Sequence, residues 1–92
     1  MKNIFKIVMA VLFSVNVQSK SIVMDPGHGY GATTSDNPDG RTAIEIETSL
    51  EVGLRTRTLI QNSCTWTVQM TRTTNLNSWV SVTQRGQMAN NW

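Results

Sequence analysis

The sequence predicts an α/β fold: a partial β-α-β-α unit of a mostly parallel sheet with flanking helices. Two short runs, near residues 21–24 and 66–70, carry the apolar or alternating pattern of strands. Each run is followed, after a polar loop, by a capping-box spacing that opens a helical pattern. Strand, helix and strand in this order predict a right-handed crossover and a parallel pair.

The first strand, about Lys20 to Asp25, leads into the pentapeptide Asp25-Pro26-Gly27-His28-Gly29, which holds the only histidine of the chain. Residues 30–41 then form a loop rich in Gly, Thr, Asn and Asp, with a turn signal at 37–40. A strand that ends in such a loop presents an imidazole at a sheet edge as a metal ligand or a base. The alternative is a tight turn with a solvated His28.

The capping-box spacing from Thr42 to Glu45 predicts a helix that begins there and runs to about Gln61. Its apolar face comprises Ile46, Leu50, Gly53, Leu54 and Ile60. Gly53 allows close approach to the sheet at a cost in helix propensity.

The second strand, residues 66–70, alternates Trp66, Val68 and Met70 with polar residues. A second capping box, residues 81–84, opens a helix that offers Val82, Met88 and Ala89 to the core. Cys64 is the only cysteine, so it forms no internal disulfide. We expect it to be a buried apolar filler, and the alternative is a thiol that pairs with a partner outside this sequence.

The amino end is typical of a secretory signal peptide, residues 1–19. Lys2 and Lys6 precede an apolar run at 7–13, and we predict cleavage after Ser19. The run is shorter than the ~20 residues of a membrane span, so we expect no stable span after cleavage and export to the periplasm or the extracellular space. An uncleaved anchor is the alternative.

Charge excludes one class of partner. Lys2 and Lys6 account for the whole formal charge of +2, so residues 20–92 carry balanced charge. Without a basic stripe or an aromatic platform on a strand, we expect no nucleic-acid binding.

A set of residues in fixed order identifies a family. The pentapeptide around His28 is followed by Glu45 at a helix start, then by Thr71-Arg72, by 80–85 and by Ala89-Asn90. This set, which runs through residues 21–90, resembles the zinc-dependent N-acetylmuramoyl-L-alanine amidases of the family-3 type. The resemblance implies zinc-assisted hydrolysis of the amide between N-acetylmuramic acid and the L-alanine of the peptidoglycan stem peptide.

The resemblance also implies site residues. His28 matches the first zinc ligand and Glu45 the second, whereas the second histidine ligand and the general-base glutamate of the family have no counterpart in this chain. Glu47 competes with Glu45, since the helical wheel does not decide between them; the family's leucine five residues after its glutamate matches Glu45 to Leu50. The structural alternative for each glutamate is a carboxylate favoured by the helix dipole.

Other side chains are assigned supporting roles. Asp25 either orients His28 through a hydrogen bond or forms the turn before proline. Arg72 and Arg85 are expected to pair with carboxylates and fix the intervening loop, although Asn75 stands where the family often has an acid. Trp79 is either a loop residue or a stacking platform for sugar.

These residues predict the amino-terminal part of an amidase catalytic domain over residues 20–92, truncated and inactive by itself. The alternatives are a non-catalytic peptidoglycan-binding or regulatory module, and a truncated reading frame whose full-length parent is the enzyme.

Overall fold

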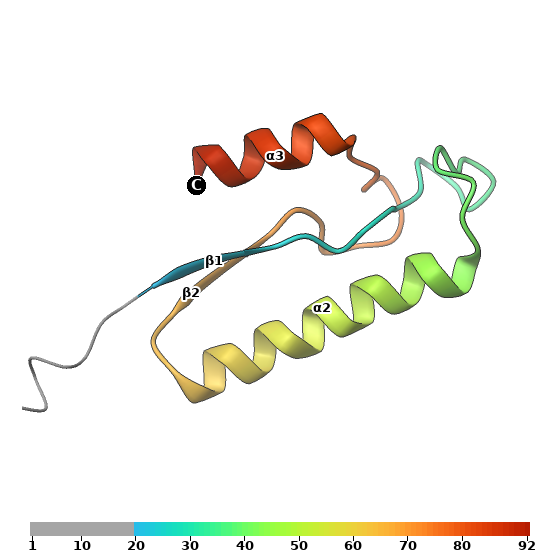
Figure 1. The fold of residues 1–92 in the computed structure, drawn as a ribbon. Helices are drawn as coiled ribbons and strands as arrows, with labels where there is room; N and C mark the ends of the chain where they lie inside the picture. Colours follow the sequence, from blue (N-terminus) through green and yellow to red (C-terminus); the bar gives the residue numbers. More distant parts are fainter. Residues whose placement is uncertain (1–19) are drawn as a thin grey trace, which may run out of the picture.

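The computed structural model describes residues 20–92, and the predicted signal peptide, residues 1–19, lies outside the described residues. The elements follow one another as β1 (Ser21–Met24), α2 (Ala43–Ser63), β2 (Thr67–Met70) and α3 (Val82–Asn91) (Figure 1). The α/β class and the β-α-β-α order are therefore confirmed.

The sheet consists of β1 and β2, which pair in parallel with Ser21 opposite Thr67 and Met24 opposite Met70. The helix α2 makes the crossover and lies on one face of the pair, and α3 lies on the other (Figure 1). Because parallel strands end at the same edge, the segments that follow β1 and β2 become neighbours. The amide of Thr71 extends the pairing beyond the strands by donating to the Met24 carbonyl at 3.0 Å.

The start of α2 follows the predicted capping geometry. The Thr42 hydroxyl accepts a hydrogen bond from the Glu45 amide at 3.2 Å, which satisfies one of the free donors of the first turn. The inward face buries Ile46, Leu50 and Gly53. A Cβ atom at Gly53 would lie 3.0 Å from Pro26 Cγ and 3.1 Å from a terminal methyl carbon of Met70, so this glycine permits the close approach of helix and sheet that the sequence predicts.

The outward face of α2 is mixed in character. It carries the Glu51–Arg55 ion pair at 2.6 Å beside the exposed apolar side chains of Ile44, Val52 and Leu59. Among the helices formed by residues 20–92, none combines the length and the apolar character required to cross a bilayer.

The helix α3 is attached to the rest of the fold mainly by a polar residue. Its capping box is complete, with the Gln84 amide donating to Ser81 Oγ at 3.2 Å. Arg85 is the one buried residue of this helix, and Met88 is half-buried. The prediction that Val82 and Ala89 pack in the core is wrong: Val82 is 87% exposed and Ala89 is exposed, because Arg85 occupies the inward side of the helix.

Cys64 caps the carboxyl end of α2 and is exposed. The prediction of a buried apolar filler is therefore wrong. Its thiol donates to the Ile60 carbonyl at 3.3 Å. Trp66, just before β2, is half-buried, with Lys20 Nζ 5.8 Å from the centre of its ring.

Gly53→Val is expected to lower the free energy of unfolding by about 1–3 kcal/mol, the usual cost of overpacking. The added carbons would press on the Pro26 ring and on Met70. Gly86→Val in α3 is the matched control, because nothing lies within 4 Å of a Cβ atom there. Urea unfolding followed by circular dichroism measures both; equal losses in the two variants would contradict the assigned close approach.

Candidate functional site

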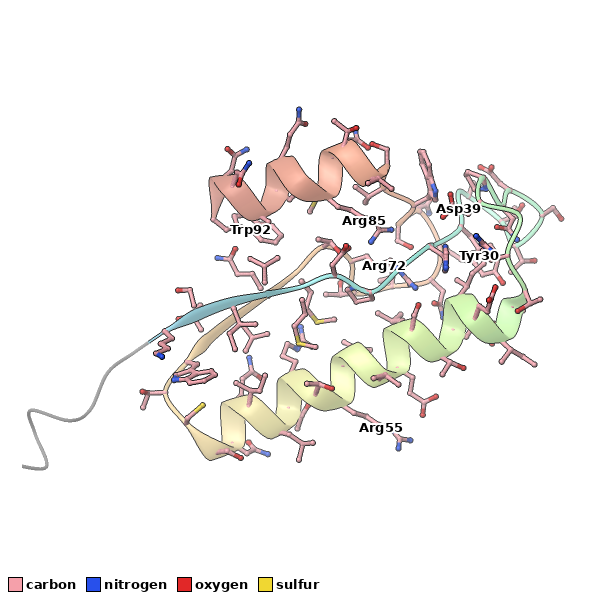
Figure 2. All side chains as sticks on the ribbon, viewed as in Figure 1. Tyr30, Asp39, Arg55, Arg72, Arg85 and Trp92 are labelled. Atoms are coloured by element: carbon pink, nitrogen blue, oxygen red, sulfur yellow. The ribbon has the colours of Figure 1, made fainter. Side chains whose placement is uncertain are left out.

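The pentapeptide after β1 is held by its backbone oxygens. The consecutive carbonyls of Pro26, Gly27 and His28 all accept hydrogen bonds from arginine guanidinium groups. The arginines are Arg72, from the segment after β2, and Arg85, from α3 (Figure 2). Both are buried, with relative exposures of 4% and 8%. A guanidinium presents five N–H donors in one plane, which suits a row of loop carbonyls.

Arg72 joins the pentapeptide to α2 and to its own loop. Its acceptors are Pro26 O (3.2 Å), Gly27 O (2.7 Å), Ile46 O (2.8 Å), Ser49 Oγ (2.9 Å), Thr74 O (2.9 Å) and Asn75 Oδ1 (3.2 Å). The set contains no carboxylate, so Arg72 fixes the loop through neutral oxygens, and the amide of Asn75 serves where the family often has an acid. Burial, with the nearby charge of Arg85, lowers the pKa of Arg72 from its ordinary value.

Arg85 joins the pentapeptide to α3. It donates to the carbonyls of Pro26 and His28, each at 2.7 Å, and pairs with Asp25 Oδ1 at 2.5 Å. The predicted pairing of an arginine with a carboxylate therefore holds for Arg85.

Asp25 directs its carboxylate toward Thr71 and Arg85. Thr71 Oγ1 donates to Asp25 Oδ1 at 2.7 Å, the same oxygen that Arg85 contacts. Burial works against ionisation of this group, but the hydrogen bonds from Arg85 and Thr71 and the two guanidinium charges outweigh it and lower the pKa of Asp25. Asp25 thus fixes the turn and α3, whereas the carboxylate at the imidazole of His28 belongs to another residue.

That residue is Asp39. Its Oδ2 lies 3.0 Å from His28 Nδ1, and its Oδ1 accepts from the Trp79 indole N–H at 3.0 Å. The hydrogen bonds from His28 and then Trp79 lower the pKa of Asp39. Within residues 20–92, Nε2 of His28 makes no hydrogen bond, and the ring is 30% exposed. His28 also has a φ of 66°, which places it in the left-handed region that non-glycine residues rarely occupy. Residues with such strained backbones are often found at functional sites.

Asp39 and Trp79 reach this position by different routes. Asp39 lies in the predicted turn, which the Gly40 amide closes on the Asn37 carbonyl at 3.0 Å. Trp79 is placed by its own amide, which donates to the buried Tyr30 carbonyl at 3.1 Å. The sequence pattern did not indicate Asp39 as a site residue, because an aspartate between proline and glycine is already explained by turn formation.

Glu45 and Glu47 are both exposed on the first turns of α2. Glu45 lies in the first turn of α2, and this end of the helix lies toward the carboxyl edge of the sheet (Figure 1). The residues that the structure describes contain no group of three His, Cys, Asp or Glu side chains placed to hold a metal ion. His28 and Glu45 therefore provide at most part of a ligand set.

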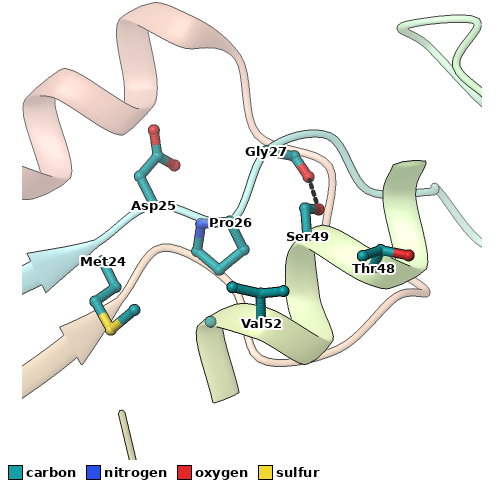
Figure 3. A pocket seen from close by; sticks show the side chains of 8 residues that line it. Met24, Asp25, Pro26, Gly27, Thr48, Ser49 and Val52 are labelled. Atoms are coloured by element: carbon teal, nitrogen blue, oxygen red, sulfur yellow. Dashed lines mark hydrogen bonds between the residues drawn. The ribbon is translucent and has the colours of Figure 1, made fainter. Parts of the chain in front are cut away.

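A shallow pocket of about 410 Å³ lies between the start of the pentapeptide and α2 (Figure 3). Met24, Pro26, Val52 and Gly53 supply its apolar wall. Ser49 closes one side by donating to the Gly27 carbonyl at 2.9 Å. His28 and Asp39 do not line this pocket, so it is separate from the imidazole.

Comparison of the chain with models of protein families, with curated proteins and with solved structures gave no match.

Asp25→Asn is expected to destabilise the protein at neutral pH by about 1 kcal/mol, the discounted value of a half-exposed charged hydrogen bond. The folded-state pKa of Asp25 is lowered, so its contribution is complete above the ordinary carboxyl pKa near 3.8 and is lost as the pH falls below it.

Urea unfolding of the wild type and of Asp25→Asn between neutral pH and about pH 2 measures this contribution. The variant should lose less stability on acidification than the wild type, while the part contributed by Asp39 remains. Parallel acid profiles for the two proteins would refute the role of Asp25.

Proposed function

We propose that this chain is the amino-terminal portion of a zinc-dependent N-acetylmuramoyl-L-alanine amidase, an exported hydrolase of bacterial peptidoglycan. The observation that carries the proposal is the setting of His28. It follows a strand at the carboxyl edge of the sheet, its backbone is held by Arg85, and a carboxylate binds its Nδ1. An imidazole held in this way leaves Nε2 available as a metal ligand.

The donor chemistry suits zinc. Neutral imidazole nitrogen and carboxylate oxygen are ligands of catalytic Zn²⁺ sites, which use three protein ligands and keep one position open. His28 and Glu45 would hold the ion, with Glu45 in the first turn of α2. When bound, zinc would lower the pKa of its bound water to about 7 and polarise a substrate carbonyl.

The remaining residues of the site support the loop that carries His28. Arg72 and Arg85 donate hydrogen bonds to the pentapeptide carbonyls, and Asp25 forms an ion pair with Arg85. A rigid ligand-bearing loop reduces the cost of organising a metal site. In the family, the third ligand and the general base are a further histidine and a further glutamate, and this chain contains a single histidine.

That single histidine favours a second candidate, a non-catalytic module that binds peptidoglycan. Such a module would retain the edge of the fold without the chemistry. The two candidates differ in the zinc binding and in the peptidoglycan hydrolysis that they predict.

The first experiment measures zinc binding by calorimetric titration of residues 20–92. We expect weak binding that His28→Ala abolishes and that Glu45→Ala weakens by about tenfold or more, equivalent to about 1.4 kcal/mol. Glu47→Ala, a matched change two positions along the same helix, should leave the affinity nearly unchanged. Equal losses from the two glutamate variants would mean that Glu45 is the wrong ligand or that the site does not exist.

The second experiment measures dye release from labelled peptidoglycan with added Zn²⁺. This chain should release no more dye than its His28→Ala variant, because it lacks a counterpart of the general-base glutamate of the family. General-base catalysis is typically worth about 10²–10⁴-fold. A protein extended along the same reading frame through a second histidine and a further glutamate should be active.

Cleavage by the short chain at the rate of the extended one would contradict the assignment of the missing residues. Cosedimentation of the short chain with peptidoglycan, combined with a stop codon directly after Trp92, would favour the binding module.

A further inference from the structure

Asp39 lies between His28 and Trp79 (Figure 2). One oxygen of its carboxylate contacts the imidazole, and the other accepts from the indole. The three side chains come from separate parts of the chain: the pentapeptide, the turn at 37–40 and the loop before α3. Each contact is 3.0 Å long. The carboxylate is therefore fixed at both oxygens, although the aspartate side chain is 34% exposed.

The contact with the Asp39 carboxylate decides which ring nitrogen of His28 carries the proton. An ionised carboxylate only accepts hydrogen bonds, so Nδ1 of His28 must carry the proton that forms the 3.0 Å contact. Nε2 of the neutral ring is then unprotonated and holds the free electron pair. An unrestrained imidazole in water favours the opposite tautomer, with the proton on Nε2. The contact with Asp39 thus selects the form in which Nε2 is ready to bind a metal.

We propose that Asp39 is the positioning residue of His28: its carboxylate keeps the proton on Nδ1 and leaves Nε2 as the electron-pair donor, and Trp79 keeps the carboxylate in place. The identity of the bound ion as zinc rests on the proposed function, whereas the tautomer does not.

The backbone explains why this arrangement needs a second anchor. Asp39 belongs to an exposed turn, so its side chain has little packing to hold it. Trp79, in contrast, is tied through its amide to the carbonyl of Tyr30, which is 3% exposed. The indole N–H therefore connects the Asp39 carboxylate to a residue whose backbone is hydrogen-bonded to the buried Tyr30.

The tautomer is measured directly by nitrogen NMR of the ring, because the chain contains one histidine and its signals need no assignment. At about pH 8, where an ordinary imidazole is neutral, the wild type should show a protonated Nδ1 and an unprotonated Nε2. Asp39→Ala should shift the ring toward the Nε2-protonated form. Asp39→Asn retains an acceptor oxygen and should preserve much of the wild-type pattern, and Trp79→Phe should give a mixture.

Asp36→Ala is the matched control, since Asp36 is an acid of the same loop that makes no hydrogen bond to His28 among the described residues. It should leave the ring signals unchanged. A wild-type ring protonated on Nε2, or an Asp39→Ala ring identical to the wild type, would overturn the proposal. If Asp39→Ala fails to fold by circular dichroism, Trp79→Phe provides the test, and a Trp79→Phe ring identical to the wild-type ring would overturn the role of Trp79 in holding the carboxylate.

Zinc titration of the same variants separates the two proposals. Asp39→Ala should weaken zinc binding by about 10–100-fold, the usual effect of removing a residue that orients a ligand histidine. A wild type that shows the expected tautomer but binds no zinc would overturn the metal site while supporting the role of Asp39. Zinc binding that is unaffected by Asp39→Ala would overturn the positioning role while supporting the metal site.

Discussion

Two buried guanidinium groups bind the pentapeptide carbonyls and thereby connect the helices to the end of the sheet. Arg72 comes from the segment after β2 and Arg85 from α3, and together they reach the oxygens of Pro26, Gly27 and His28. Loop carbonyls withdrawn from water need partners, and here the partners are charged donors, whose hydrogen bonds are stronger than neutral ones. The loop is thereby bound to α2 and α3 at once.

This polar framework compensates for a small apolar core. Among residues 20–92, the buried hydrophobic side chains are Tyr30, Ile46 and Leu50. A two-stranded sheet has little stability of its own and gains it from packing against a helix. α3 adds mainly Arg85 and a half-buried Met88 to the interior, so the attachment of this helix and the shape of the loop depend on the same side chain.

The framework also explains the conformation of His28. A φ of 66° is unfavourable for a non-glycine residue, and such strain persists only where the surroundings hold it. The carbonyl of His28 is bound by Arg85, and its ring is bound by Asp39. The histidine is therefore held at both its backbone and its side chain, as the proposed role of a metal ligand requires.

Local periodicity, capping chemistry and glycine geometry were sufficient to predict the α/β class, the order and approximate bounds of the elements, both helix starts and the close approach at Gly53. The partners of the site residues could be read only from the folded chain, as could the exposure of Val82 and Cys64. There, Asp25 binds Arg85 and Thr71, Asp39 binds His28, and Arg72 uses neutral oxygens. Such pairings join residues up to 60 positions apart, and their choice depends on the distances that folding creates, which no local pattern encodes.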